Sequence, residues 1–444
     1  MSGVTVALTN FLAKQRAAAR LRVRGSPDRV GVRYGRIYGI ICGMEEKERD
    51  IREGIVKRRE FLRMACCTAG AYALGGCSLS RGGGCRALRQ AADEYVAKGL
   101  YSGLACASTR GDMYVCGMRT LEEPRLPVTP DTLFDMASVG KTQTAALCAL
   151  LNAEGRLDVD APFTEYLPEH VLAKERCRIT VRDLATHSGG FDNSKPYMTS
   201  DADRMFTELF RKRPVRPRGE RFEYACSNYV YLGLIVERLT GLDLDAAAKK
   251  LLWGPLGMKR TTWKPVVGDP DVAEYPTSTY ACVKGMPARR RIGERNDICA
   301  YLAPRPMGNG ANFSTVGDML RFVTDMLERR QFQSAYYDLM FTPSFDRGGH
   351  RRSFGWDMTA EKSTFAVWTR TGFSSSAICH TGWTGGAIAV DPERDFAGVV
   401  LGNRLASKEK TMGPRMKLLD AMCVYADRMT EEDYNGKIHH CSRR

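Results

Sequence analysis

Two residues with complementary chemistry, Ser138 and Lys141, stand three positions apart in the sequence. A serine hydroxyl is a weak nucleophile until an adjacent base takes its proton. Residues three apart in a helix lie on one face, so the amine of Lys141 would meet the hydroxyl of Ser138. Because desolvation lowers the pKa of a partly buried lysine, Lys141 is predicted to act as the general base. The spacing therefore predicts a serine nucleophile.

The same Ser-x-x-Lys spacing occurs again at Ser407 and Lys410. The first copy follows an apolar segment, residues 132–134, and opens a helical pattern over 138–154. The second copy lies in a charged segment with no apolar run directly after it, which predicts a solvated loop. A structural alternative for Ser138 is an ordinary helix N-cap. The start of a helix also offers backbone donors to a developing oxyanion, so the first copy is the better candidate site.

Two further motifs follow in the chain. Residues 222–229 read Phe-Glu-Tyr-Ala-Cys-Ser-Asn-Tyr, and residues 380–386 read His-Thr-Gly-Trp-Thr-Gly-Gly. Together with residues 138–141, they resemble the three motifs of the β-lactamase-related serine hydrolases. That family includes class C β-lactamases, DD-peptidases and related esterases. The resemblance covers most of residues 85–430 and implies an α+β fold, in which helices flank an antiparallel sheet and a helical segment is inserted.

The resemblance gives Ser138, Lys141 and Tyr224 their expected roles. Ser138 would be acylated, with Lys141 as its general base. Tyr224 would pass the proton to the leaving group, a role open to a tyrosine whose pKa is lowered by a nearby lysine. The structural alternative for Tyr224 is a core aromatic residue. His187, in the segment Thr-His-Ser-Gly-Gly, is interpreted as structural.

The third motif, His380-Thr381-Gly382, stands where the family usually has Lys-Thr-Gly. By resemblance, its strand would flank the acyl pocket, with His380 hydrogen-bonded near the catalytic tyrosine or a substrate carboxylate. The backbone N–H groups of Ser138 and Trp383 would form the oxyanion hole. A structural histidine is the alternative for His380.

Cys226 departs from the family pattern, which often has Asn at this position. That Asn offers an amide to the substrate, whereas a thiol is a weak donor and a weak acceptor. The change should weaken recognition of β-lactams and peptides more than acylation itself. Asn228 could serve instead if the loop shifts its register. Cys226 could itself be a nucleophile in principle, but no His or Asn partner is recognisable for it.

These motifs predict a serine hydrolase that acts on a small-molecule ester or on a D-amino-acid amide or peptide. One alternative is a true β-lactamase. Another is a catalytically inactive lipid-anchored protein that binds cell-wall fragments. The sequence contains no zinc-type cluster of Cys and His, so neither a metal nor another cofactor is expected.

The N-terminal region resembles an export signal. Residues 57–63 (Lys-Arg-Arg-Glu-Phe-Leu-Arg) precede a short apolar segment, as in a twin-arginine signal. Residues 74–77 (Leu-Gly-Gly-Cys) resemble a bacterial lipobox, which predicts lipidation of Cys77 and a position in the cell envelope, anchored to the membrane. Residues 44–77 would be the signal and residues 78–84 a tether. Residues 1–43 are basic and fit poorly before a signal, so translation is expected to start at Met44 rather than Met1, or these residues form a basic extension.

Composition indicates the class of protein that carries these motifs. The chain has 444 residues, 43% apolar and 26% charged, a globular profile. Its net charge of +15 is concentrated towards the N-terminus, which favours a mildly basic surface over a nucleic-acid-binding protein. Fifteen cysteines show no compact disulfide framework, so most are expected to be buried free thiols, although one pair could bridge.

The elements that must position these residues follow from hydrophobic patterning. We expect a helix over 87–97, a hairpin of strands 103–108 and 113–118, and the helix 138–154. A mostly helical insertion over about 156–310 and a helix over 314–327 come next. The chain should end in strands 354–358, 365–369, 386–390 and 397–402, a helix over 414–430 and a tail, 431–444. This order predicts an α+β sheet built from both ends of the domain.

Overall fold

The computed structural model describes residues 86–424, apart from residues 176, 196–198, 200, 275–291, 304, 369–372 and 406–407. All the described residues belong to the unit Ser78–Arg444. The predicted signal, Cys77, the tether and the tail lie outside the described residues. Within the described part, no helix combines the length and the apolar character needed to cross a bilayer.

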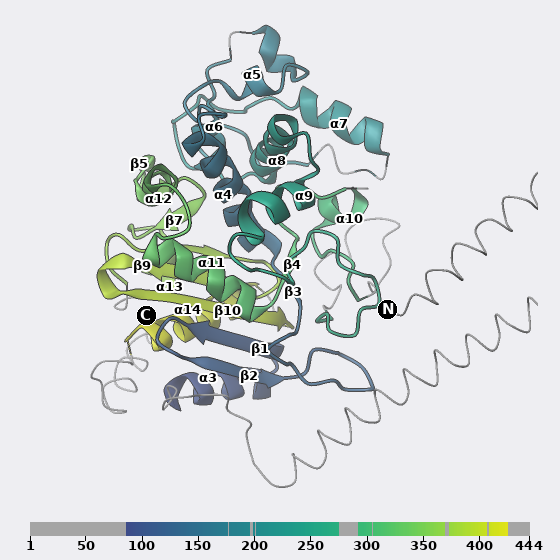
Figure 1. Cartoon of the computed structure of the whole chain (residues 1–444), viewed down its shortest axis with the longest axis vertical. Helices are drawn as coiled ribbons and strands as arrows, with labels where there is room; N and C mark the ends of the chain where they lie inside the picture. The colour runs from purple at the N-terminus through teal and green to yellow at the C-terminus, as the bar shows by residue number, and fades with distance from the viewer. Residues whose placement is uncertain are drawn as a thin grey trace, which may run out of the picture. The chain divides into compact units, whose positions relative to one another are not determined.

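An antiparallel sheet of eight strands is the scaffold of the domain, in the order β2-β1-β10-β9-β8-β7-β6-β5 (Figure 1). The strands are β1 (Tyr101–Ser108), β2 (Met113–Gly117), β5 (Phe345–Arg347), β6 (His350–Ser353), β7 (Trp356–Met358), β8 (Ile378–Thr381), β9 (Ala387–Asp391) and β10 (Phe396–Arg404). The first strand pairs with the last, with Leu104 opposite Gly402. The prediction of a sheet built from both ends of the domain is therefore confirmed.

Helices cover both faces of this sheet. Side chains alternate between the two faces along each strand, so one strand can contribute to the core on either side. In β10, Val399 and Leu401 join the larger core, which includes α11 (Val316–Glu328). Val400 points the other way, into a core shared with α3 (Arg86–Ala97) and α14 (Lys408–Val424). Thr315 caps the start of α11, since its hydroxyl accepts a hydrogen bond from Asp318 N at 3.2 Å.

A block of helices lies between β2 and β5 in the chain and forms the upper part of the molecule in Figure 1. The helices of the block are α4 (Gly140–Ala153), α5 (Phe163–Tyr166), α6 (Val181–Ala185), α7 (Ala202–Arg211), α8 (Cys226–Thr240), α9 (Leu244–Ala248), α10 (Ile298–Leu302) and α12 (Ser334–Phe341). Two short paired strands, β3 (Phe134–Asp135) and β4 (Phe313–Ser314), support the start of α4. The nucleophile candidate follows β3 directly.

Two predicted elements are wrong. Residues 364–368 form a helix, α13 (Thr364–Trp368), rather than a strand. Their aromatic and β-branched residues favour a strand, but Thr364 N donates to Asp357 Oδ2 at 2.7 Å and satisfies a donor of the first helical turn. Lys408 to Lys410, in the second Ser-x-x-Lys copy, begin α14 rather than a loop.

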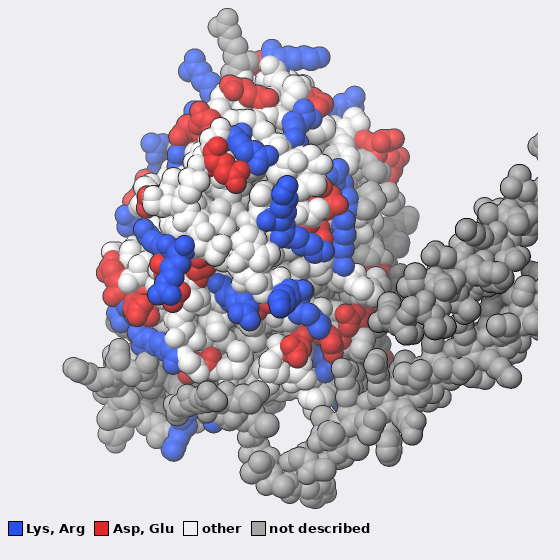
Figure 2. All heavy atoms as spheres, viewed as in Figure 1, with Lys and Arg blue, Asp and Glu red and all other residues white. Residues whose placement is uncertain are grey.

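The described cysteines are all free thiols: Cys106, Cys116, Cys148, Cys177, Cys226, Cys299, Cys379 and Cys423. Most of them are buried, as expected for thiols that pack as small apolar groups. Acidic and basic side chains, by contrast, are interspersed over the surface drawn in Figure 2.

Candidate active site

Ser138 lies in one tight turn, Ala137–Val139, that leads into α4. Ala137 has a φ of 43°, a left-handed conformation that costs a residue with a Cβ about 1–2 kcal/mol. Two hydrogen bonds hold the turn: Ala137 N donates to Asp135 Oδ1 (2.7 Å), and Ala137 O accepts from Ala311 N (3.0 Å). This strained turn fixes the position of the serine hydroxyl.

Lys141 lies on the first turn of α4, and its side chain is buried. Its Nζ is 3.0 Å from Ser138 Oγ and donates to Asn309 O at 2.5 Å. Burial acts to lower the pKa of Lys141, but Cys226, Tyr224 and other neighbours outweigh it, and the pKa is raised. The direction of this shift is opposite to the lowering that desolvation alone predicts for Lys141, so the protonated amine is favoured.

Tyr224 precedes α8, and its hydroxyl lies 2.7 Å from Ser138 Oγ. Its ring also contacts the amine of Lys141, with 5.1 Å between Nζ and the ring centroid. His187 supports this position: its Nδ1 accepts from Ala225 N at 3.2 Å, and its ring lies 4.5 Å from that of Tyr224. Lys141 and Tyr224 therefore both approach the hydroxyl of Ser138, and His187 has a structural position.

His380 lies on β8 and lines the same pocket. Burial, followed by the charges of Arg352 and Lys141, holds the pKa of His380 well below its usual value. Its Nδ1 lies 3.0 Å from the carbonyl of Thr381, which fits a neutral ring that donates from Nδ1. His380 is therefore an uncharged group where the family motif usually carries a lysine.

The turn after β8 brings Gly382 and Trp383 next to the nucleophile. A Cβ at Gly382 would come within 2.6 Å of Met136 O, so the backbone of the turn packs directly against the segment before Ser138. Thr384 Oγ1 donates to Asp135 O at 2.5 Å and joins the same two segments. Behind the turn, the buried Arg415 of α14 donates to the carbonyl oxygens of Gly382 and Gly386.

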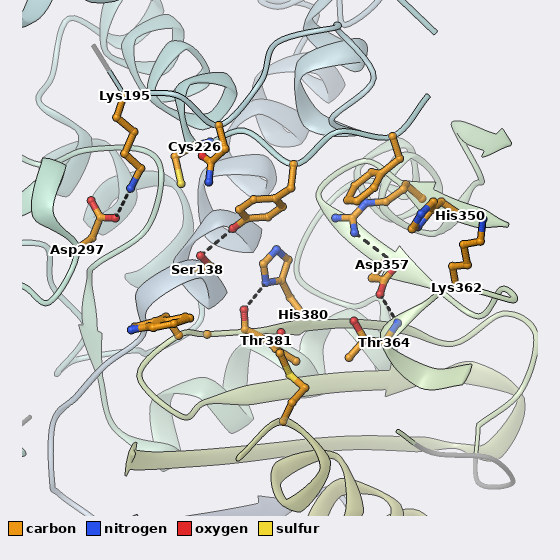
Figure 3. A pocket seen from close by; sticks show the side chains of 17 residues that line it. Ser138, Lys195, Cys226, Asp297, His350, Asp357, Lys362, Thr364, His380 and Thr381 are labelled. Atoms are coloured by element: carbon orange, nitrogen blue, oxygen red, sulfur yellow. Dashed lines mark hydrogen bonds and ion pairs between the residues drawn. The ribbon is translucent and has the colours of Figure 1, made fainter. Parts of the chain in front are cut away.

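A pocket of about 560 Å³ opens over Ser138 (Figure 3). Its lining residues are Ser138, Asn193, Lys195, Phe222, Tyr224, Cys226, Asp297, His350, Arg352, Asp357, Lys362, Thr364, His380, Thr381, Gly382, Trp383 and Met412. Within the described residues, no group of three or more His, Cys, Asp or Glu side chains could hold a metal. The predicted site residues are thus brought together, with one exception.

The exception is Asn228, which was predicted as a substitute for the missing family Asn. It is fully buried, and its amide lies 3.2 Å from His187 Nδ1, outside the pocket lining. Because α8 already begins at Cys226, the register of this segment is fixed and Asn228 points into the core. Cys226 does line the pocket, and its backbone N–H donates to Asn193 Oδ1 at 3.0 Å.

Sequence patterns missed two groups of pocket residues. Asn193, Lys195 and Asp297 lie near Cys226, and Lys195 pairs with Asp297 at 3.4 Å. Phe222 and Arg352 belong to the other group. The position of Phe222 two residues before Tyr224 is a usable signal, because alternate residues of an extended segment share a side. Arg352 carries no such signal, since it stands in a polar segment.

Comparison with known proteins places this site in a family. A sequence model of the β-lactamase family matches residues 88–421. The chain belongs to the β-lactamase family. Members of this family are serine hydrolases, and all three motifs lie within the matched residues. A protein of Salmonella typhi described as "Putative D-alanyl-D-alanine carboxypeptidase" is 27% identical over 321 aligned residues, and the match covers 65% of this chain and 73% of that protein.

Solved structures of β-lactamase-family proteins share the fold. A β-lactamase/D-alanine carboxypeptidase from Pseudomonas syringae superimposes with a TM-score of 0.63 at 21% identity, over 77% of this chain and 98% of that one. EstCE1, a hydrolase with promiscuous acyltransferase activity, gives 0.62 at 18% identity, over 76% and 97% of the two chains. At these identities the likeness concerns the fold alone, and it confirms the predicted α+β architecture of the serine β-lactamase and DD-peptidase type.

Proposed function

We propose that this β-lactamase-family hydrolase forms an acyl-enzyme on Ser138 and acts on an ester or a D-amino-acid amide or peptide. One observation carries the proposal: Ser138 Oγ lies within hydrogen-bond distance of both Lys141 Nζ (3.0 Å) and Tyr224 OH (2.7 Å), at the edge of an open pocket. The relative described as a carboxypeptidase supports the same class of chemistry.

In the proposed acylation step, Ser138 Oγ attacks the substrate carbonyl carbon and its proton passes to the neutral amine of Lys141. The tetrahedral oxyanion would be held by the backbone N–H groups of Ser138 and Trp383, since preorganised donors need no rearrangement. The bond to the leaving group then breaks, and Tyr224 passes a proton to the departing nitrogen or oxygen. Water releases the acyl group by the same steps in reverse order.

Labelling with a fluorophosphonate tests the identity of the nucleophile. We expect the probe to modify Ser138, as mapped by mass spectrometry of the labelled peptide. The variant S138A should lose labelling, and turnover of p-nitrophenyl esters or D-Ala-D-Ala peptides should fall about 10⁴-fold or more. The variant S407A, which changes the second Ser-x-x-Lys copy, is the matched control and should retain both. Modification at any other residue would contradict the proposal.

The same assays separate the alternatives. A true β-lactamase would hydrolyse nitrocefin with many turnovers, which we do not expect because the thiol of Cys226 cannot replace an amide. A catalytically inactive binding protein for cell-wall fragments would bind peptide without labelling or turnover by any acyl donor. The strained turn at Ala137 and the two contacts of the serine hydroxyl favour the enzyme.

We also propose that the protein is exported and anchored in the cell envelope through a lipid on Cys77. The support is the order of the twin-arginine pattern and the Leu-Gly-Gly-Cys segment in the sequence. Cells grown with radioactive palmitate should incorporate label into the wild-type protein and not into C77S. The variant C85S, at the next cysteine along the chain, is the control and should remain labelled. Equal labelling of C77S would refute the assignment.

A further inference from the structure

His187 stands just after the end of α6 in a backbone conformation that normally belongs to glycine. The helix ends at Ala185, and His187 follows two residues later with a φ of 58°. Glycine is the usual residue at this point of a helix end, because a Cβ is strained in the left-handed region. Strain of this kind collects at functional sites. The chain therefore keeps the imidazole of His187 at a cost to its backbone.

The ring of His187 is fully buried and uncharged. Burial, followed by the charges of Arg352 and Lys141, holds the pKa of His187 well below its usual value. Nδ1 accepts from Ala225 N at 3.2 Å and lies 3.2 Å from the side-chain nitrogen of Asn228, so the proton of the neutral ring is on Nε2. Among the described residues Nε2 has no hydrogen-bond partner. The hydrogen bonding of this ring is thus directed to the start of α8.

His187 holds the chain on both sides of Tyr224. Its carbonyl oxygen accepts from Glu223 N at 2.9 Å, and its Nδ1 accepts from Ala225 N at 3.2 Å. Between these two contacts, the imidazole lies against the ring of Tyr224, with 4.5 Å between the centroids. The far end of that ring carries the hydroxyl that lies 2.7 Å from Ser138 Oγ. His187 therefore sets the distance between the two hydroxyls.

The packing around His187 keeps its own ring in place. Phe222 meets the imidazole edge to face, with ring centroids 5.9 Å apart, and the ring of Tyr229 lies 5.1 Å away. Tyr229 OH donates to Ala185 O at 2.8 Å and so ties α8 to the end of α6, which pack against each other in the upper part of Figure 1. The imidazole cannot tilt without moving one of these helices.

Tyr224 needs this support because of where it lies in the chain. The helix α8 begins only at Cys226, so the backbone of Tyr224 gains nothing from helical hydrogen bonds. A proton donor acts only within hydrogen-bond reach of the atom that it protonates. A displacement of about 1 Å at such a group can slow a reaction about 100-fold.

We propose that His187 is a positioning residue that holds Tyr224 in place to protonate the leaving group. The inference rests on the proposed function of Ser138. As the bond between the carbonyl carbon and the leaving atom breaks, its electron pair goes to that atom, which takes the proton of Tyr224. The acyl group stays on Ser138 Oγ, and Tyr224 recovers a proton from Lys141, which had taken one from Ser138. His187 is outside the pocket lining and acts only through Tyr224.

The test uses a p-nitrophenyl ester and a phenyl ester of the same acid. The p-nitrophenolate departs readily as an anion, whereas the more basic phenolate gains from a proton donor. In H187L, kcat/KM should fall about tenfold or more for the phenyl ester and stay within about twofold for the p-nitrophenyl ester. Y224F should show the same selective loss. H187N should recover most of the phenyl esterase activity, because asparagine tolerates a left-handed backbone and offers an oxygen near the place of Nδ1.

A double variant and a control show whether the effect passes through Tyr224. In the Y224F background, H187L should change the ratio of the two rates by less than about twofold, since the hydroxyl to be positioned is already absent. H170L replaces another buried histidine, which contacts Phe163 and Tyr231 instead. It should keep the wild-type ratio even where it lowers stability.

Each ratio is measured within one variant, so a general loss of folded protein cancels. Equal losses on both esters in H187L, or an undiminished effect of H187L in the Y224F background, would overturn the positioning role. Fluorophosphonate labelling of Ser138 tests the proposed function separately, because fluoride leaves without a proton donor. If labelling succeeds while the ratio is unchanged in H187L, the serine hydrolase stands and the role of His187 does not.

Discussion

Lys141 and Tyr224 approach the same oxygen, and the state of their protons decides how Ser138 can react. The raised pKa of Lys141 favours its ammonium form. An ammonium ion donates to Ser138 Oγ and cannot accept its proton. If Lys141 is the base, the reactive molecules are therefore the minority with a neutral amine.

This leads to a prediction for the pH dependence of acylation. The fraction of neutral Lys141 grows about tenfold per pH unit below its pKa, so kcat/KM should rise with that slope from pH 6 to 9, without a plateau near neutrality. The measurement is the second-order rate of fluorophosphonate labelling at Ser138 across that range. A plateau at pH 7 would show that another group accepts the proton.

At the scale of elements, the turn between β8 and β9 depends on one buried arginine. Arg415 donates through Nη1 to the carbonyls of Gly382 and Gly386, and through Nε and Nη2 to Thr411. In this way α14 fixes a backbone segment that carries Trp383, a proposed oxyanion donor. A cation on the far side of the sheet from the helical block thus contributes to the geometry over Ser138.

Replacing Arg415 should show whether it positions the turn for catalysis, which affects kcat, or contributes to substrate binding, which affects KM. In R415M the two carbonyls lose their side-chain donor and keep only backbone donors, Gly385 N to Gly382 O and Gly382 N to Gly386 O. The free energy of unfolding should therefore fall by about 1–3 kcal/mol, and kcat should fall about tenfold to a hundredfold with little change in KM. R415K should recover part of the activity. Steady-state kinetics and thermal melts measure the two effects.

The matched control is R110M, since Arg110 also donates to two backbone carbonyls, those of Cys423 and Arg394, away from the pocket. It should lose stability and keep kcat. If R415M behaved in the same way, Arg415 would have no part in positioning the turn.

Local patterns predicted these elements well where one face is apolar. The hairpin at 101–117 and the helices α4 and α11 follow directly from hydrophobic spacing. Strand β6 was not predicted, because His350 and Arg351 give it no alternating apolar face and it lies near the edge of the sheet. The same polar segment gave no signal for Arg352, which lines the pocket because the sheet carries it there.

Those residues of the candidate site that belong to short motifs could be predicted from the sequence. Ser138, Tyr224 and His380 each belong to such a motif, and the structure brings all three together. The raised pKa of Lys141 depends on Cys226 and Tyr224, which fold against it from distant parts of the chain. Asn193 and Asp297 are likewise brought in by loops, so no spacing in the sequence indicates them.

For the whole molecule, the pairing of β1 with β10 sets the order of events during synthesis. Gly103 N and Asn403 Oδ1, which are hydrogen-bonded at 2.7 Å, are separated by 300 residues. At about 5–20 residues per second, a ribosome needs roughly 15–60 s to make that intervening stretch. Throughout that time β1, which is buried along all eight residues in the finished protein, lacks its central partner. A fully buried strand is therefore open to aggregation for much of the synthesis of the chain, and contacts so distant in sequence form slowly.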